Sequence, residues 1–352
     1  MSFHARIVRL IGTGLPAVMA AGVIAQSALA DAPLRVLQRW TIAGAGGWDY
    51  LTLDSTGQRL FLSRATRVEV LDTLSGRVIG TIPDTNGVHG IALAPDLKRG
   101  YTSNGKADSV TAFELDTLKT IKEVPVPGHN PDAILYDPAG KQVFTFNGRS
   151  KDVTVLDATT LAVVATLPVP GKPEFAVDDG EGRIFVNIET EPGQIVVIDS
   201  RALTIKATWT LPGCASPTGL ALDHARRRLF SVCNDKVMAV TDAADGRQVA
   251  KVEIGDGPDA VAYDAKRRLV FSSNGGDGTL TVVHQESADR YRVVDSVRTQ
   301  KGARTLALDS ASGKVYLVTA EMGPAPASTV EQAHPRPLPL PNTFTVLVVG
   351  AP

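Results

Sequence analysis

The sequence lacks the short motifs that mark several common catalytic centres. It contains no HExxH, CxxC, GxSxG or GxxxxGK[ST] pattern. His129, His224 and His334 fall in predicted loops and show no ligand spacing. These absences argue against a zinc-peptidase helix, a nucleophile elbow and a phosphate-binding loop. They also disfavour a haem or copper centre built on several histidines.

A strong charge of either sign is missing too. The chain has 36 basic and 37 acidic residues, which gives a net charge of −1 at pH 7. A chain without a basic excess lacks the general electrostatic footprint for nucleic acid or anionic lipid. Nucleic acid is therefore not an expected partner, and only a local basic patch stays open.

Long hydrophobic runs are absent after the first thirty residues. The apolar stretch from Leu10 to Ala25 follows Arg6 and Arg9 and is followed by Ala28-Leu29-Ala30. This order predicts a cleaved secretory signal at residues 1–30. The alternative is a membrane anchor, but the stretch is interrupted by glycine and proline and is shorter than the ~20 residues of a span. We expect a periplasmic or secreted protein without a membrane span.

What the sequence does have is a repeat. A segment of seven residues recurs as WDYLTLD, VHGIALA, PDAILYD, PEFAVDD, PTGLALD, PDAVAYD and ARTLALD. The second residue of this landmark falls at positions 49, 89, 132, 174, 218, 259 and 304. Steps of 40 to 45 residues with strand-like content are typical of propeller blades. The seven copies predict seven blades.

Each repeat holds three further β-branched runs, so four strands per blade are expected. The fold class is therefore all-β: a seven-bladed β-propeller of four-stranded blades, forming a single domain over residues 31–352. The last repeat ends at TFTVLVVG without a fourth run, and Leu34 to Gly44 is a strand-like run without a repeat of its own. We expect this N-terminal strand to close the ring in the last blade, which leaves no long unpaired edge.

The two cysteines belong to the fifth repeat. Cys214 precedes its first strand and Cys233 ends its second, so both fall at the same rim of an antiparallel hairpin. An exported protein meets an oxidising compartment, and we therefore predict a Cys214–Cys233 disulfide. The alternative is two separate buried thiols.

The recurring FLSR, YTSN, FTFN and FSSN runs at this period resemble those of the YVTN-repeat seven-bladed β-propellers, and among them the periplasmic YncE-like family. The resemblance covers essentially the whole predicted mature chain. It implies a periplasmic propeller and leaves the function open, because lactonases, a streptogramin lyase, oxidoreductase domains and binding proteins share this scaffold.

The second residue of each landmark supplies the candidate ligand-binding site. In propellers of this kind the innermost strand starts beside the central channel, so these residues should form a ring. They are Asp49, His89, Asp132, Glu174, Thr218, Asp259 and Arg304. Gathering such charges costs desolvation free energy unless water, a cation or mutual pairing compensates. We expect a polar, net-acidic pocket; alternatively, the acids only accept backbone N–H bonds where the strands begin.

Three ring positions carry an ionisable residue other than Asp, namely His89, Glu174 and Arg304. His89 and Glu174 are the candidate catalytic residues. The candidate metal ligands are Asp49, Asp132, Glu174 and Asp259, whose oxygen atoms suit Ca²⁺ or Mg²⁺. No other cofactor is indicated.

Several other polar or aromatic positions have two readings. Trp48 and Tyr50 flank Asp49 and would either stack on a ligand or pack at the ring closure. The Asn-Gly pairs at residues 104, 147 and 274 suit tight hairpin turns. The Pro-rich loop 321–342, in the last blade, should lie on the face of the ring, either as a cap carrying His334 and Arg336 or as a surface strap.

We expect a monomer that binds a small molecule or an envelope protein at the ring. One alternative is a lactonase-like hydrolase or lyase assisted by a divalent cation. Another is single-stranded nucleic-acid binding, which the YncE-like resemblance implies. The sequence leaves open whether the protein is an enzyme.

Overall fold

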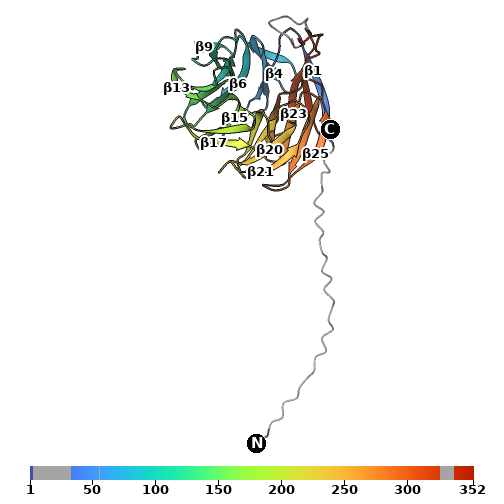
Figure 1. Ribbon diagram of the computed structural model, residues 1–352. Helices are drawn as coiled ribbons and strands as arrows, with labels where there is room; N and C mark the ends of the chain where they lie inside the picture. The colour runs from blue at the N-terminus through green and yellow to red at the C-terminus, as the bar shows by residue number, and fades with distance from the viewer. Residues whose placement is uncertain (3–32, 55, 326–336) are drawn as a thin grey trace. The chain divides into compact units, whose positions relative to one another are not determined.

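The structure, a computed structural model, describes residues 1–2, 33–54, 56–325 and 337–352. Its contacts divide the chain into Met1–Ala32 and Pro33–Pro352. The predicted signal sequence lies outside the described residues. In the second unit the described strands form seven four-stranded antiparallel sheets, set around a common axis as blades (Figure 1). The prediction of an all-β, seven-bladed propeller is confirmed.

The innermost strand of each blade coincides with the sequence landmark. These strands are β2 (Leu51–Leu53), β6 (Val88–Ala94), β10 (Pro131–Asp137), β14 (Lys172–Asp178), β18 (Pro217–Asp223), β22 (Pro258–Asp264) and β26 (Leu306–Asp309). A short 3-10 helix, η1 (Pro95–Leu97), follows β6. No described residues form a helix long and apolar enough to cross a membrane.

The two middle strands of each blade are buried on both faces, because every blade packs between two neighbours. The second strands are β3 (Arg59–Arg64), β7 (Arg99–Asn104), β11 (Gln142–Asn147), β15 (Arg183–Glu189), β19 (Arg228–Cys233), β23 (Leu269–Asn274) and β27 (Lys314–Thr319). The third strands are β4 (Arg67–Asp72), β8 (Ser109–Glu114), β12 (Asp152–Asp157), β16 (Gly193–Asp199), β20 (Val237–Asp242), β24 (Thr279–Gln285) and β28 (Phe344–Gly350). An aromatic ring sits at the third position of each second strand, fully buried: Phe61, Tyr101, Phe144, Phe185, Phe230, Phe271 and Tyr316. These rings fill the spaces between the blades.

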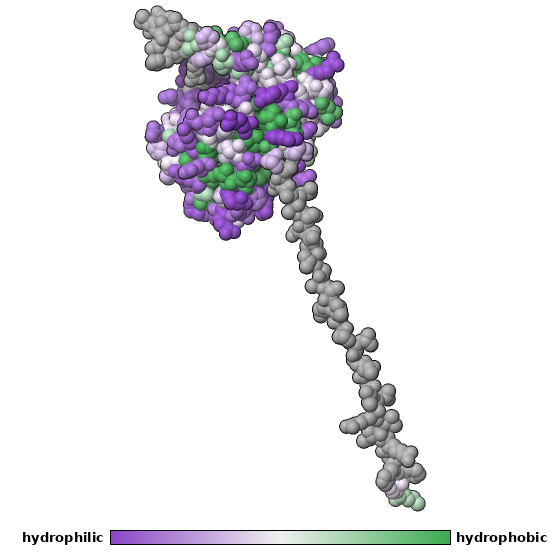
Figure 2. All heavy atoms as spheres, turned by 90° about the vertical axis from the view of Figure 1, so that its right-hand side faces the viewer, coloured by the Kyte–Doolittle hydropathy of each residue, from purple (hydrophilic) through white to green (hydrophobic). Residues whose placement is uncertain are grey.

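The outermost strands are partly or fully exposed to solvent along most of their length. They are β5 (Val78–Ile82), β9 (Thr120–Pro125), β13 (Val163–Pro168), β17 (Thr204–Leu211), β21 (Gln248–Glu253), β25 (Tyr291–Arg298) and β1 (Arg35–Ile42). On β25, for example, Val293 and Val294 are exposed. Figure 2 shows one side of the molecule, where hydrophilic residues surround smaller apolar groups. Scattered apolar side chains of this kind are ordinary for a protein surface.

The ring closes through the N-terminal strand. In the last sheet the order is β1-β28-β27-β26, and β1 runs antiparallel to β28 from the pair Arg35–Gly350 to the pair Ile42–Phe344. In Figure 1 the blue β1 lies beside the red C-terminal strand. Trp40 of β1 packs on Tyr316 of β27, with ring centroids 5.8 Å apart. The predicted closure by an N-terminal strand in the last blade is confirmed.

The fifth blade contains the predicted disulfide. Cys214, before β18, is bonded to Cys233, at the end of β19, with 5.3 Å between the Cα atoms. Both residues are buried. The disulfide prediction is confirmed, and separate thiols are excluded.

The Asn-Gly pairs lie where the second strand turns into the third, as predicted, but the turns are four-residue loops in which neither Asn nor Gly takes a positive φ. Asn104 is fully buried, and its Nδ2 donates to the hydroxyl oxygens of Ser109 and Thr111 across the turn. Asn147 and Asn274 make matching bonds in blades 3 and 6. These amides therefore fasten the second strand to the third.

Candidate functional site

A backbone irregularity places the ring residues. The pairing of the first and second strands shifts register across the landmark in five blades, for example between Pro131 and Ile134 and between Pro173 and Ala176. Such a β-bulge re-aims the side chain at that point. Asp132 lies inside the first of these shifts together with Ala133, and Glu174 lies inside the second together with Phe175. The bulge therefore interrupts the regular alternation of side chains where the ring residues lie.

Asp49 is the centre of a network that joins four blades. His89 Nδ1 lies 2.5 Å from one oxygen of Asp49, Oδ2, and Arg304 Nη2 lies 3.1 Å from the other, Oδ1. The second terminal nitrogen of Arg304, Nη1, lies 3.1 Å from Oδ2 of Asp259. The structure thus brings together the ring residues of blades 6, 7, 1 and 2.

Asp132 extends this network into blade 3 without a close partner. Its Oδ1 lies 3.6 Å from His89 Nδ1, beyond hydrogen-bond range. No described residue donates a hydrogen bond to its carboxyl group, although the residue is 92% buried at 8% exposure. His89 therefore lies between two carboxyl groups but is bonded to only one of them.

A second group of charges surrounds Glu174. Lys172 Nζ lies 2.8 Å from Glu174 Oε2 and 3.0 Å from Glu189 Oε2. Tyr50 approaches the other oxygen of Glu174, with 3.3 Å from its hydroxyl to Oε1. The ring is thus balanced in part by Lys172, a cation that the sequence reasoning missed.

A signal for Lys172 was present in the repeat. The residue immediately before the landmark is small or an amide in the other six copies, where it is Gly47, Gly87, Asn130, Ser216, Gly257 and Gly302. Lys172 is the one charged residue at this position. A comparison of this position across the seven copies, in addition to the second position of the landmark, identifies Lys172.

The two partners of the Asp49 carboxyl group, His89 and Arg304, favour its ionised form. Burial opposes ionisation, but the His89 hydrogen bond and the Arg304 charge outweigh it and hold the pKa of Asp49 below its usual value. Burial likewise disfavours the charged imidazole of His89. The bond to Asp49 and the charge of Asp132 outweigh this and raise the pKa of His89. The pair therefore favours imidazolium and carboxylate.

The other acids are shifted in the opposite direction. Burial, together with the charges of Glu174 and Asp49, raises the pKa of Asp132 to about 8. Burial outweighs the attraction of Arg304 and raises the pKa of Asp259 to about 7. Glu174 is raised as well, because burial outweighs the charge of Lys172. At neutral pH the ring holds carboxyl groups in different protonation states, which is a common property of functional sites.

Thr218 stands apart from these charges. Its hydroxyl group lies 3.1 Å from the carbonyl oxygen of Pro258 in the next blade, to which it donates. The residue is buried at 5% exposure. In blade 5 the ring residue thus links the inner strand β18 to the inner strand β22 by a hydrogen bond.

Three ring residues could share a metal ion. One ligand atom each from Asp49, His89 and Asp132 lie within 4.8 Å of one another. The other predicted metal ligands, Glu174 and Asp259, are paired with Lys172 and Arg304. A nitrogen with two carboxylate oxygens suits Zn²⁺ or Mn²⁺ as well as the harder ions.

The aromatic residues beside Asp49 separate into two roles. Trp48 packs on Phe344 of the last blade, with ring centroids 5.7 Å apart, which is the closure role. Tyr50 instead packs on Phe175 of blade 4 at 5.3 Å and is buried at 7% exposure. Tyr50 therefore reaches from blade 1 to the Glu174 group.

The described residues at the two ends of the Pro-rich loop pair with each other through the backbone. Met322 bridges to Pro339, and Leu340 N donates to the carbonyl of Glu321 over 2.8 Å. Asn342 exchanges hydrogen bonds with Gly44, ahead of the first blade. Residues 326–336, with His334 and Arg336, lie outside the described residues, so the cap stays a prediction.

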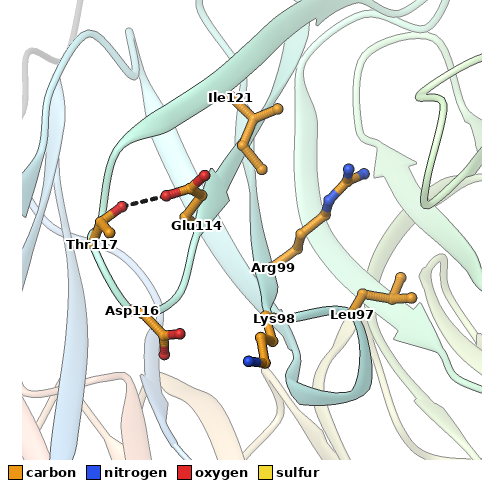
Figure 3. Close-up of a pocket in the computed structure, with 7 residues that line it drawn as sticks. All are labelled: Leu97, Lys98, Arg99, Glu114, Asp116, Thr117 and Ile121. Carbon is orange, nitrogen blue, oxygen red and sulfur yellow. Dashed lines mark hydrogen bonds between the residues drawn. The ribbon is translucent and has the colours of Figure 1, made fainter.

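A cavity of about 370 Å³ opens among the turns of blade 2, at the rim opposite to the ring (Figure 3). Three of its polar side chains, Arg99, Glu114 and Thr117, are hydrogen-bonded within the protein. Arg99 donates to the carbonyls of Ala158 and Thr159 in blade 3, and Glu114 accepts a bond from Thr117. This cavity is therefore a poor candidate for the function.

Comparison with known proteins supports the fold and leaves the function open. The profile of a family described as lactonase, 7-bladed beta-propeller, matches residues 50–161. The chain is similar to this family over that stretch, which contains His89 and Asp132. Curated proteins give no match.

Solved structures resemble the propeller at low sequence identity. Hydrazine synthase of Kuenenia stuttgartiensis has a TM-score of 0.69 and 17% identity, covering 78% of this chain and 92% of that one. U3-55K has a TM-score of 0.71 and 12% identity, with 91% and 98% covered. The RRP9 WD40 repeats have a TM-score of 0.72 and 12% identity, with 92% and 98% covered. At such identities the likeness concerns the fold alone.

Proposed function

We propose that this protein is an exported propeller that binds a small polar ligand at the ring. The carboxyl group of Asp132 carries the proposal. It is buried, no described residue gives it a hydrogen bond, and its nearest cation, His89, is bonded to Asp49 instead. The carboxyl oxygens of Asp132 keep access to solvent and are therefore free to exchange hydrogen bonds with a ligand at the ring.

The charge balance of the ring indicates the kind of ligand. Four landmark carboxyl groups and Glu189 face three basic side chains: His89, Lys172 and Arg304. The raised pKa values of Asp132 and Asp259 leave these two groups wholly or partly protonated at pH 7, so the ring is nearly balanced in charge and offers hydrogen-bond donors as well as acceptors. This combination favours a polar ligand with several hydroxyl groups or with charges of both signs. The chain has no basic excess that would favour a nucleic-acid backbone.

Export fits the same proposal. Disulfides persist mainly in oxidising compartments, and the Cys214–Cys233 bond is of the structural, buried kind. Together with the predicted signal sequence and the YncE-like resemblance, it supports a periplasmic or secreted protein, which we propose to be a monomer. Its ligand would be a small molecule or a side chain of an envelope protein.

A thermal-shift screen tests the proposal. Sugars, polyols, amino acids and polyamines are tested with the mature protein and with Asp132→Asn and Glu174→Gln variants. We expect at least one compound to bind the wild type and to bind the variants at least ~10-fold more weakly, a loss of about 1.4 kcal/mol. Asp157→Asn, on the opposite rim, is the matched control. Ring variants that bind every hit like the wild type would contradict the proposal.

A hydrolase is the second candidate, and the paired Asp49 and His89 favour it together with the lactonase profile over residues 50–161. A divalent cation held by Asp49, His89 and Asp132 would supply a Lewis acid. Glu174, outside that cluster and with a raised pKa, is suited to accept a proton from an attacking water. Hydrolysis would add water across the ester bond of a lactone and give the hydroxy acid as the single product.

Hydrolysis of glucono-1,5-lactone, followed at constant pH by base uptake, tests this second candidate. The protein is first treated with EDTA and then given Mg²⁺, Ca²⁺, Mn²⁺ or Zn²⁺ in turn. We expect cation-dependent hydrolysis that His89→Ala and Glu174→Gln reduce at least ~10-fold, while Asp157→Asn retains it. Equal rates in all four proteins would assign the hydrolysis to solution chemistry.

A further inference from the structure

One inner strand breaks the repeat at a position away from the ring. The sixth residue of the landmark is apolar or aromatic in six blades: Leu53, Leu93, Tyr136, Leu222, Tyr263 and Leu308. In blade 4 it is Asp178. The register shows that the positions are equivalent, because Asp178 pairs with Ile184 just as Tyr136 pairs with Val143. A carboxyl group has thus replaced an apolar contact at the channel wall.

Asp178 faces a cavity of about 330 Å³ at the channel end opposite to the ring. The wall of the cavity comes from the inner strands of blades 3 to 6, through Leu135, Ala176, Leu220 and Val261. Tyr263 and His224 also line it. The ring residues lie at the start of these strands and the cavity lies toward their ends, so the two places are separate.

The turn that follows Asp178 does not need its carboxyl group. Asp179 accepts the N–H groups of Glu181 and Arg183 and pairs with the Arg183 side chain at 2.7 Å. Asp54 does the same for the corresponding turn of blade 1. Asp178 receives one bond, from the Gly180 N–H at 3.0 Å. Turn formation therefore leaves most of the hydrogen-bonding capacity of Asp178 unused.

The surroundings of Asp178 favour a positive charge. The neighbouring Asp137 is buried at 2% exposure, and its Oδ2 has no hydrogen-bond partner in the described structure. Burial, and then the charge of Asp137, raise the pKa of Asp178. Among the described residues that line the cavity there is no lysine or arginine, and His224 is exposed. A cation entering here would meet Asp178 and an apolar wall, with the buried Asp137 behind that wall adding to the negative potential.

We propose that this lower-channel cavity binds a small organic cation, with a protonated amine at Asp178 and an apolar body against Leu135, Leu220 and Val261. A volume of about 330 Å³ is at the small end of the range for ligand sites, so it fits a monoamine with one ring. The ammonium group would replace the water that Asp178 loses on burial and would form a charge-assisted hydrogen bond. This site is independent of the ring.

Calorimetric titration of the mature protein with phenethylamine tests the proposal. The uncharged 2-phenylethanol and the anionic phenylacetate have the same apolar body. We expect phenethylamine to bind the wild type and to bind Asp178→Leu at least ~10-fold more weakly. Phenylethanol should bind both proteins equally, and phenylacetate should gain affinity in Asp178→Leu. Asp116→Leu, exposed on the same face in blade 2, should bind phenethylamine like the wild type.

Asp178→Leu restores the residue type of the repeat, so we expect it to fold, and Asp178→Asn provides a second variant of nearly unchanged shape. Equal phenethylamine affinity in wild type and both variants would overturn the proposal, as would no binding to the wild type. Loss of phenethylamine binding in Glu174→Gln would also overturn it, because the amine would then occupy the ring.

Discussion

His89 Nδ1 lies 2.5 Å from Asp49 Oδ2, and this contact joins the inner strand of the second blade to the start of the first. The same carboxyl group holds Arg304 of the last blade at 3.1 Å. Asp49 therefore has a structural role at the place where the ring closes. The less engaged Asp132 is the better position at which to test binding without opening the ring.

The first prediction concerns pH. A carboxyl group with a folded pKa of about 8 keeps a proton that the unfolded chain loses near pH 4, so stability falls between about pH 4 and pH 8. The raised pKa of His89 acts in the same direction, since its stabilising contribution is lost as pH rises through the folded value. Asp132→Asn removes the first contribution. We expect the loss of unfolding free energy between pH 5 and pH 8 to shrink by at least about 1 kcal/mol, measured by urea denaturation.

Asp157→Asn is the control for this measurement. Hydrogen bonds from Thr160 lower the pKa of Asp157, so its contribution is present at higher pH and is lost only as pH falls through the acidic range. Its variant should keep the wild-type difference between pH 5 and pH 8. An unchanged difference in Asp132→Asn would mean that Asp132 is ionised in the folded protein.

The second prediction concerns Gly105, which gives the His89 ring its space. A Cβ at Gly105 would lie 2.7 Å from both Nε2 and Cδ2 of His89, closer than real contacts allow. Gly105→Ala should therefore displace the imidazole of His89 and weaken the binding of a ligand to the landmark residues without changing any charge. The His89 resonances in NMR spectra would report the displacement.

Gly148→Ala is the matched control, since Gly148 follows Asn147 as Gly105 follows Asn104. Its Cβ would meet the side chain of Lys172 at 3.1 Å and no atom of His89, so this variant is the control for the His89 signals and not for ligand binding. His89 signals that are unchanged in Gly105→Ala would show that the position of the imidazole does not depend on this glycine.

The third prediction concerns the disulfide. Its bond closes a loop with a sequence separation of 19, for which chain entropy gives a stabilisation of ~3 kcal/mol. Reduction should lower the unfolding free energy of the wild type by about this amount. The Cys214→Ala/Cys233→Ala double variant should be insensitive to reductant. Thiol titration that finds reactive cysteine in the unreduced, denatured protein would contradict the bond.

The fourth prediction concerns the closing strand. A protein that begins at Ala43 lacks β1 and leaves β28 as an exposed edge, which promotes association between chains. We expect a lower melting temperature and self-association in size-exclusion chromatography with light scattering. A synthetic peptide of residues 33–44, added to this truncated protein, should restore the monomer. A melting temperature equal to that of the wild type in the protein without β1 would show that the closing strand adds no stability.

The sequence predicted the fold well because a period of 40 to 45 residues leaves few architectures open. It also predicted that the landmark positions meet, since equivalent places in seven blades converge at one end of the channel. It did not reveal which of them pair. That outcome depends on the register shifts that aim Asp132 and Glu174, and on side chains from other columns of the repeat, such as Lys172 and Tyr50.

Thr218 illustrates the limit of reading a column of the repeat. It occupies a ring position, yet its short hydroxyl is taken up by the Pro258 carbonyl. Asp178 illustrates the opposite case, in which an unusual residue lies in a column that looked purely structural. In both, the decisive information is the space and the partners around the side chain, which only the packed blades supply.

The closure by β1 also sets an order of events in time. Gly44, just after β1, is hydrogen-bonded to Asn342, a separation of 298 residues along the chain. During synthesis, β1 emerges before the other strands and its partner β28 emerges after them, so the last blade cannot be completed until nearly the whole chain is present. Contacts of such long range make folding slow. Until then β1 is an unpaired strand, and a cell that makes this protein must keep β1 from pairing with other chains.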